Sequence, residues 1–175
     1  MSAAHSLRQD RRGVSAIEFA LVLPFLILLY LGGYQLSDAI AAQRKVTIAT
    51  RSIVDLTSRY TSVTNADLAT ILNASRQVMA PYSTAHASMS VSQIAIDKDG
   101  NGTVMWSYPT DGDGLTPGES FDVPAEIRQP NTWILVGEMT YDYTPVVGQG
   151  LIGRIPMRDE IIMSPRASNS VELKT

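Results

Sequence analysis

Residues 14–34 read VSAIEFALVLPFLILLYLGGY, and this stretch decides the fold of the 175-residue chain. Its one charged residue is Glu18. A helix of this length spans about 31 Å, close to the thickness of the hydrocarbon core of a bilayer. A buried helix of a soluble protein fits poorly, because residues 19–34 have no polar face. We therefore predict a transmembrane helix over residues 14–34.

A cleaved secretory signal peptide is the main rival interpretation of this stretch. The apolar run is too long for one, and no small-residue cleavage site of the A-x-A kind follows it. Residues 8–12 carry three arginines and one aspartate, whereas the first positive charges after the helix are Arg44 and Lys45. The positive-inside rule then keeps residues 1–13 in the cytoplasm as a leader and places the chain from about residue 36 on the far side.

Two residues within the apolar helix are chemically unusual. Pro24 cannot donate a backbone hydrogen bond to the carbonyl of Ala20, so we expect a kink there. Such kinks are also tolerated in membrane helices without any special role. Glu18 is more informative, because a carboxylate within an apolar run costs about 2–3 kcal/mol. It either lies near enough to the headgroups to reach water or has a functional role.

The order of residues around Gly13 resembles the class III signal of type IV pilins and pseudopilins. Basic residues precede Gly13, Glu18 is the fifth residue after it, Phe19 follows, and the long apolar helix continues from there. The Glu-aromatic pair resembles the variant found in Flp/Tad pili. The whole block RRGVSAIEFALVLPFLILLYLGGYQL, including Pro24, is similar to the N-terminal signature of the TadE/TadG-like pilus-assembly family.

This resemblance implies that a prepilin peptidase cuts between Gly13 and Val14. Glu18 and Phe19 would then serve assembly, with the Glu18 carboxylate pairing with a free α-amino group and setting the register between packed helices. The implied protein is a structural component, similar to a minor pseudopilin, of a Tad-type (type IVc) pilus. It would sit in a bacterial inner membrane with a periplasmic C-terminal domain.

The implied partners are the lipid bilayer, other pilus subunits, assembly-platform proteins and the prepilin peptidase. Major Flp subunits are much shorter chains, so a bulk pilin is not expected. The alternative is an uncleaved single-pass anchor whose outer domain binds a partner or calcium. A tethered periplasmic enzyme is a third class, which we do not expect.

The helical pattern continues beyond the apolar stretch to about residue 60, with no Gly or Pro between residues 36 and 60. Apolar residues there follow a 3.6-residue period that predicts packing on the next domain: Leu36, Ile40, Val46, Ala49, Ile53 and Leu56. A second helix is predicted near residues 66–80, capped by Thr64 or Asn65 and ended by Pro81.

The remaining pattern predicts strands. Residues 87–108 alternate imperfectly around a turn at 97–102, which indicates a β-hairpin. Residues 109–131 are rich in Pro and Gly and predict a long loop with a short helix at 124–128. Further strands are expected at 132–143 and 155–164, followed by a loose polar tail from Pro165. The sequence thus predicts an α+β, pilin-like fold: a long transmembrane helix, then an extracytoplasmic domain over 61–175 with a small antiparallel sheet and one extra helix.

Asp97, Asp99 and Asn101, followed by Gly102, match the first half of a calcium-binding loop. The twelfth position of that loop is Tyr108, where a bidentate Glu is required. The same residues are good turn formers at a hairpin tip. We therefore favour a turn and keep weak calcium binding as the alternative; no other cofactor is predicted.

Composition argues against several classes of function. The formal net charge of −3 disfavours general nucleic-acid binding, and the absence of cysteine excludes thiolate chemistry. The histidines are His5 and His86, and a Ser-His-Asp triad through His86 stays open for catalysis. The paired carboxylates Asp159 and Glu160 are more simply interpreted as part of a solvated polar stretch. Five strand aromatics are predicted to be core residues, with contact to other pilus subunits as the alternative: Trp106, Tyr108, Trp133, Tyr141 and Tyr143.

Overall fold

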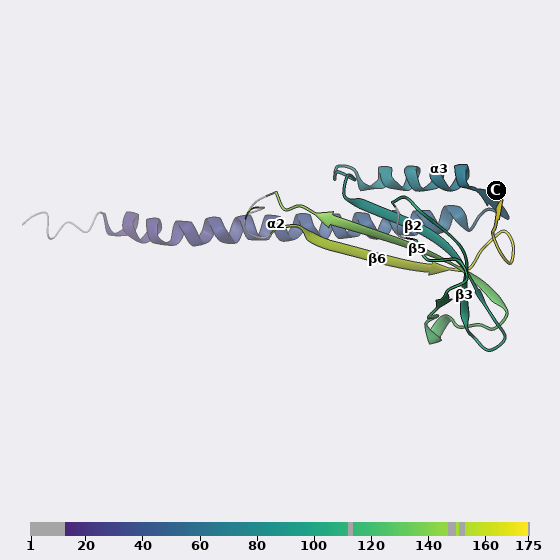
Figure 1. Cartoon of the computed structure of the whole chain (residues 1–175). Coiled ribbons are helices and arrows are strands. Elements are labelled where there is room, and N and C mark those ends of the chain that lie inside the picture. The colour runs from purple at the N-terminus through teal and green to yellow at the C-terminus, as the bar shows by residue number, and fades with distance from the viewer. Residues whose placement is uncertain (1–12, 112–113, 147–149, 151–152, 175) are drawn as a thin grey trace, which may run out of the picture. The chain divides into compact units, whose positions relative to one another are not determined.

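The computed structural model describes residues 13–111, 114–146, 150 and 153–174, drawn as a ribbon in Figure 1. The chain divides into two compact units, one ending at Ala39 and the other beginning at Ile40. Helix α2 (Val14–Thr57) is followed by a five-stranded sheet and a second helix, which confirms the predicted α+β class. Residues 1–12 of the predicted leader lie outside the described residues.

The part of α2 that belongs to the second unit is amphipathic. Its buried residues recur every three or four positions, as packing of one helical face requires: Ala42, Val46, Ala49, Thr50, Ile53, Val54 and Thr57. The predicted stripe is confirmed at Val46, Ala49 and Ile53. Leu36 and Ile40 were expected on the same face, but 64% and 48% of their surfaces are exposed. The helix ends at Thr57, three residues before the predicted end.

Helix α3 (Asn65–Arg76) begins with a reciprocal cap and continues into the short helix η1 (Gln77–Met79). Thr64 Oγ1 accepts a hydrogen bond from the backbone N–H of Asp67 at 3.2 Å, and Asp67 Oδ2 accepts one from the backbone N–H of Thr64 at 2.9 Å. These bonds satisfy backbone donors that a helix start leaves free. The hydrogen bonds from Thr64 also lower the pKa of Asp67. The predicted helix and its Thr64 cap are both confirmed.

The sheet has the order β4–β3–β2–β5–β6, and every neighbouring pair is antiparallel. Its strands match the predicted hairpin and the two later strands and add the short strand β4: β2 (Ala87–Ile96), β3 (Gly102–Pro109), β4 (Ser120–Phe121), β5 (Thr132–Tyr143) and β6 (Ile155–Met163). Strand β4 and the short helix η2 (Ala125–Ile127) lie in the predicted long loop, and η2 corresponds to the predicted short helix.

The imperfect alternation of β2 arises because the sheet buries side chains on both faces. Val91 and Met89 share the face of their partners on β5, Gly137 and Met139, and Gly137 packs on α2. Farther along the strand, a second cluster is buried on the other face: Ile94, Ile96, Val104, Val123, Ile134 and Val136. The register with β3 shifts between Gln93 and Ile94, at the change from one buried set to the other.

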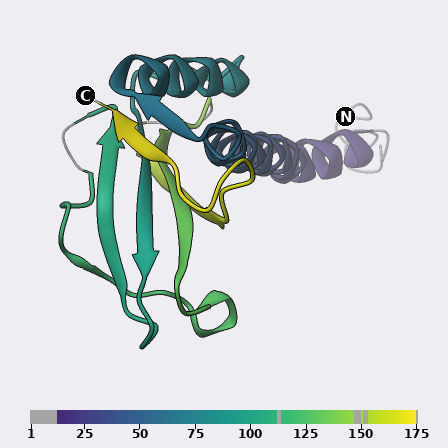
Figure 2. The ribbon, with the colours of Figure 1, turned by 90° about the vertical axis from the view of Figure 1, so that its right-hand side faces the viewer.

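The C-terminal segment was expected to be loose, and this expectation is wrong. Strand β7 (Glu172–Lys174) pairs in parallel with β1 (Ser62–Thr64), as Figure 2 shows. Upstream, the carbonyl of Ser58 accepts hydrogen bonds from the backbone N–H groups of Arg166 and Ala167 at 2.8 and 3.2 Å. The Arg166 guanidinium also forms an ion pair with Asp55 at 2.8 Å. Backbone hydrogen bonds of this kind leave no apolar pattern in the sequence. The polar composition of this segment therefore gave no sign that it is ordered.

Gly137 is a sensitive point of this packing, because a Cβ added there would overlap with Cγ2 of Val54. We expect Gly137→Ala to lower the free energy of unfolding by about 1–3 kcal/mol, since the branched Val54 side chain cannot move without disturbing α2. Urea unfolding of the full chain in mild detergent, followed by tryptophan fluorescence, measures the change. Gly150→Ala is the matched control, because a Cβ there meets nothing within 4 Å. Equal stability of both variants would contradict this packing.

Candidate functional site

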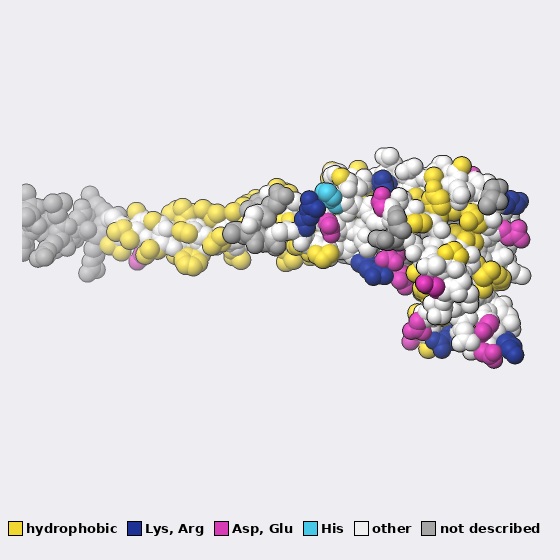
Figure 3. Space-filling model, in the orientation of Figure 1, with side chains coloured by type: hydrophobic (Ala, Val, Ile, Leu, Met, Phe, Trp, Pro, Cys, Tyr) yellow, Lys and Arg dark blue, Asp and Glu magenta, His cyan; other side chains and the backbone are white. Residues whose placement is uncertain are grey.

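The first part of α2 presents an almost entirely apolar surface. Large side chains between Val14 and Leu36 are exposed, including Phe25 at 72%, Leu29 at 74% and Tyr30 at 74%. Figure 3 shows hydrophobic side chains covering this stretch. Water-soluble proteins rarely expose an apolar surface of this extent. By length and composition, α2 is able to cross a membrane, and it is the one such helix among the described residues.

The predicted cleavage bond joins a turn to a helix. Gly13 lies in a turn, and α2 begins at Val14. The carbonyl of Gly13 accepts the backbone hydrogen bond of Ile17 at 3.2 Å, so Gly13 occupies the position directly before the helix. A Cβ added at Gly13 meets no atom within 4 Å. No described residue therefore crowds the Gly13 side of the Gly13–Val14 peptide bond.

Glu18 and Phe19 follow on the first turns of α2, and both are exposed. Val14 and Glu18 are four residues apart, so they lie on the same side of the helix, about 6 Å apart along its axis. An α-amino group at Val14 would therefore be one helical turn from the Glu18 carboxylate. Phe19 is the next residue along the helix, and 59% of its surface is exposed.

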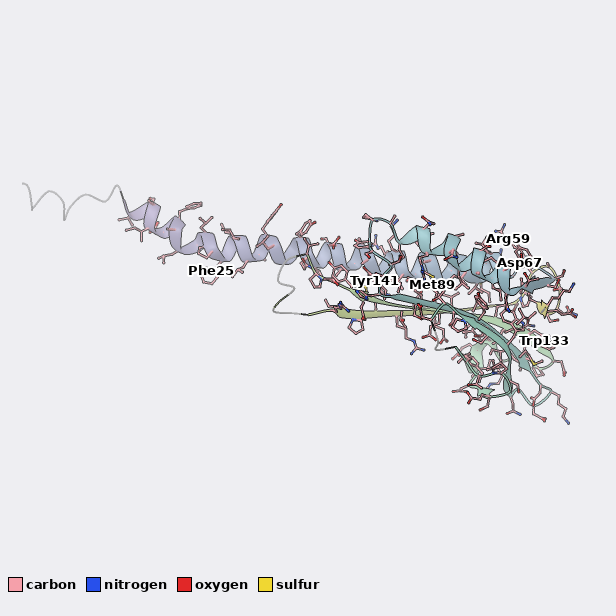
Figure 4. The ribbon with its side chains drawn as sticks, turned by 45° about the horizontal axis from the view of Figure 1, so that its top comes forward. Phe25, Arg59, Asp67, Met89, Trp133 and Tyr141 are labelled. Carbon is pink, nitrogen blue, oxygen red and sulfur yellow. The ribbon has the colours of Figure 1, made fainter. Side chains whose placement is uncertain are left out.

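Pro24 lies inside α2, which continues through it as one helix. Its neighbour Phe25, labelled in Figure 4, extends away from the helix axis. Pro24 leaves the carbonyl of Ala20 without the usual helical donor, and a kink at this point stays a prediction.

The hairpin tip is organised around the carboxylate of Asp97. Asp97 Oδ1 accepts hydrogen bonds from the backbone N–H groups of Asp99 and Asn101, both at 2.8 Å. Asp97 Oδ2 accepts one from the Asn101 side-chain amide at 3.0 Å. The Asn101 side chain, followed by the backbone donors, lowers the pKa of Asp97 from its ordinary value of 3.8. Both oxygens thus act in turn formation, as the favoured interpretation of this motif requires.

Calcium binding at this tip stays a prediction. No group of three or more His, Cys, Asp or Glu side chains within residues 13–111, 114–146, 150 and 153–174 is arranged to hold a metal ion. The Asn101 amide donates to Asp97 rather than turning its oxygen toward the same point. A calcium ion would have to compete with the hydrogen bonds that shape the turn.

A buried polar cluster that the sequence analysis missed joins the sheet to the C-terminal segment. The Trp106 indole N–H donates to Gln93 Oε1 at 2.9 Å and to the carbonyl of Val171 at 2.8 Å. Gln93 Oε1 also accepts from the backbone N–H of Val171 at 3.1 Å. The one available signal was Gln93 itself, since a glutamine at a buried strand position needs hydrogen-bond partners.

The predicted core role of the strand aromatics holds for three of them. Trp106, Tyr141 and Tyr143 are buried, whereas Tyr108 and Trp133 are half-buried.

The residues named for catalysis are spread through the fold. His86 is exposed, and its backbone carbonyl accepts a hydrogen bond from the N–H of Asp142 at 3.2 Å. Asp159 and Glu160 are successive residues of β6, so their side chains point to opposite faces of the sheet. His5 lies outside the described residues.

Together these features define an α+β protein whose long N-terminal helix carries an exposed apolar surface. Residues 13–55 match the family model described as TadE-like protein, which confirms the resemblance predicted from the sequence. The match begins at Gly13 and covers nearly all of α2. No curated protein and no solved structure matches the chain.

The Asp97 carboxylate should make the hairpin sensitive to acid. Because its pKa is lower in the folded than in the unfolded state, its stabilising contribution is complete above the ordinary value of 3.8 and is lost as the pH falls through the lowered pKa. We expect Asp97→Asn to lower the urea midpoint of the full chain at pH 7 and to differ little from the original chain at the acid end of the titration.

Asp99→Asn is the matched control, since its backbone N–H rather than its side chain takes part in the turn. A difference between Asp97→Asn and the original chain that stays constant from pH 7 to the acid end would contradict this assignment.

Proposed function

We propose that this chain is a membrane-anchored structural component of a Tad-type pilus, similar to a minor pseudopilin. The observation that carries the proposal is the TadE-like match over residues 13–55, which coincides with the helix start after Gly13. A pilus-associated role follows at the level of the family. The finer role, as a processed subunit that assists fibre assembly, rests on the chemistry of the first turns of α2.

Membrane anchoring is supported by the exposed apolar surface of residues 14–34. In water this surface would be strongly unfavourable, and in a bilayer it needs no protein cover. The arginine-rich flank of residues 8–12 favours a cytoplasmic N-terminus in the bacterial inner membrane. The unit that begins at Ile40 would then be periplasmic.

Processing is supported by the geometry at Gly13. A peptidase that works at a membrane surface needs an extended peptide that can approach its backbone closely, and a residue without a Cβ suits this. Cleavage there would remove residues 1–13 and create a free α-amino group on Val14. That group would be one helical turn from Glu18.

Glu18 supports a role for this end of α2 in assembly. Its carboxylate would be costly in the bilayer if unpaired, and pairing with an α-amino group of its own or a neighbouring chain offsets that cost. Such a pair would fix the register of neighbouring helices. The implied partners are the bilayer, other pilus subunits, the assembly platform and the prepilin peptidase. This role requires no catalysis by the chain itself.

The processing step is tested by the N-terminus of the membrane-extracted protein. In a cell that contains a prepilin peptidase, we expect a chain that starts at Val14, read by N-terminal sequencing and intact mass. Gly13→Leu should leave residues 1–13 attached, because its side chain blocks close approach of the peptide. Gly32→Leu is the matched control and should be processed normally. An intact leader on the original chain would favour the uncleaved anchor instead.

The assembly role is tested separately at Glu18. We expect Glu18→Leu to insert into the membrane normally but to reduce assembly of surface pili, because the charge that sets helix register is gone. Membrane fractionation measures the first effect, and the yield of sheared pili the second. Ser15→Leu, an apolar substitution in the same region of α2, should leave the yield unchanged. Normal pili from the Glu18→Leu strain would exclude this role.

A further inference from the structure

One face of α2 after Ala39 is exposed and combines apolar and basic side chains. We call it the basic stripe: Ile40, Arg44, Ile48 and Arg51. Their spacing of four, four and three residues places them on one side of the helix. Ile40 and Ile48 are 48% and 51% exposed, and both arginines are exposed as well. Neither arginine forms an ion pair with another described residue.

The basic stripe points away from the residues that pack on the sheet. Val46 is fully buried, and Ile48 lies about 200° around the helix from it. The acid on the same part of α2 is already engaged, because Asp55 pairs with Arg59 at 2.7 Å and with Arg166 at 2.8 Å. Within the described residues, neither Arg44 nor Arg51 therefore has an ion-pair partner on its own helix.

A surface of opposite, negative charge lies where the hairpin tip meets the segment around η2. We call this the acidic end: Glu119, Asp122, Glu126 and Ile127, beside Asp97 and Asp99. The two segments are adjacent, since they line one hollow of about 300 Å³. Ile127 is 37% exposed, and the Asp122 side chain is fully exposed. Figure 3 shows acidic side chains, interspersed with basic ones, at this end of the sheet.

Acidic groups remain in excess at the acidic end after its two basic residues are counted. Arg128 is held mainly by the carbonyl of Val123, at 3.1 Å from Nε and 2.6 Å from a terminal nitrogen, and only weakly by Asp122 at 3.4 Å. Lys98 is the second basic residue. These two adjacent segments therefore carry five carboxylates and two cations, and the exposed Ile127 directly follows Glu126.

We propose that the basic stripe of one copy of this chain docks on the acidic end of a second copy. The two surfaces are opposite in charge: the basic stripe has an exposed isoleucine between two arginines, and the acidic end has an exposed isoleucine next to Glu126 on a segment with an excess of carboxylates. The acidic edge of β6 is a weaker match, because Arg158 lies between Glu138 at 3.0 Å and Glu160 at 4.0 Å. Both complementary surfaces belong to the unit that begins at Ile40.

The contact joins two different surfaces, so it is head-to-tail and leaves one of each surface free on every pair. Such contacts extend into rings or filaments rather than closing a dimer. The two isoleucines of the basic stripe are only about 12 Å apart along α2, so a single contact buries much less than a standard interface. Its affinity is therefore modest, and cross-linking is a better readout than size in solution.

The chain contains no cysteine, so any disulfide that forms must involve the introduced cysteines. Full-length Ile48→Cys and Ile127→Cys proteins, one carrying a size tag, are mixed in mild detergent and oxidised. On non-reducing gels, we expect the mixed disulfide between the Ile48→Cys chain and the Ile127→Cys chain to be more abundant than either homodimer. High salt should weaken it, because both charged surfaces are exposed.

Charge reversal supplies the sharper test. Arg44→Glu with Arg51→Glu in the Ile48→Cys chain should reduce the mixed disulfide about tenfold, the effect of losing two or more exposed ion pairs and adding repulsion. Asp122→Lys with Glu126→Lys in the Ile127→Cys chain should then restore it. Arg154→Glu with Lys174→Glu makes the same charge change away from the basic stripe and should have no effect.

Three outcomes would overturn the proposal. If homodimers of the Ile48→Cys chain dominate, the helix faces pack on each other. If the yield of mixed disulfide is unaffected by charge reversal, the apolar helices bring the copies together; and if no mixed disulfide forms, the two surfaces do not bind each other. Because the purified protein is used without a pilus, each result is independent of the proposed processing and assembly role.

Discussion

The close approach of strand β5 to helix α2 is the constraint on which the rest of the domain depends. Gly137 lies against Val54 and the carbonyl of Thr50, and the helix surface around this contact is built from small or β-branched residues. Because the sheet lies so near the helix, most side chains on this face of β2 and β5 are buried, from Ala87 to Gln93 and from Leu135 to Tyr143. The side of α2 opposite this contact carries the exposed Ile48.

Part of the second face of the sheet is buried by another segment of the chain. Strand β4 and the segment around Val123 fold back over Ile94, Ile134 and Val136, and they form a separate core at the end of the hairpin. This arrangement explains why the domain needs a long segment rich in Pro and Gly between β3 and β5. It also places the carboxylates of that segment beside the hairpin tip.

The main elements were predictable because each leaves a periodic or compositional trace. The apolar run gives α2, Thr64 with Asp67 gives the start of α3, and the turn cluster at residues 97–102 gives the hairpin. The C-terminal segment leaves no such trace, since it is held by the carbonyl of Ser58 and by side chains distant in sequence.

The exposure of Ile40 could not be predicted either. Helical periodicity identifies an apolar face, but it does not say over what length of the helix the sheet packs on that face. For the candidate site, the order Gly13, Glu18, Phe19 and Pro24 was readable as a motif. The structure adds that the motif begins where the helix begins. Gln93 and Trp106, thirteen residues apart, form a pair only because the hairpin register aligns them.

The contact between Ser58 and Arg166 has a mechanical consequence. It ties the end of α2 to a segment more than a hundred residues later, and the parallel pairing of β1 with β7 continues that tie. The Asp55–Arg166 pair, the Ser58 carbonyl and the contact of Gly137 with Val54 therefore all hold this end of α2 to the rest of the domain. A domain whose ends are tied in this way is harder to open than one whose strands separate one hydrogen bond at a time.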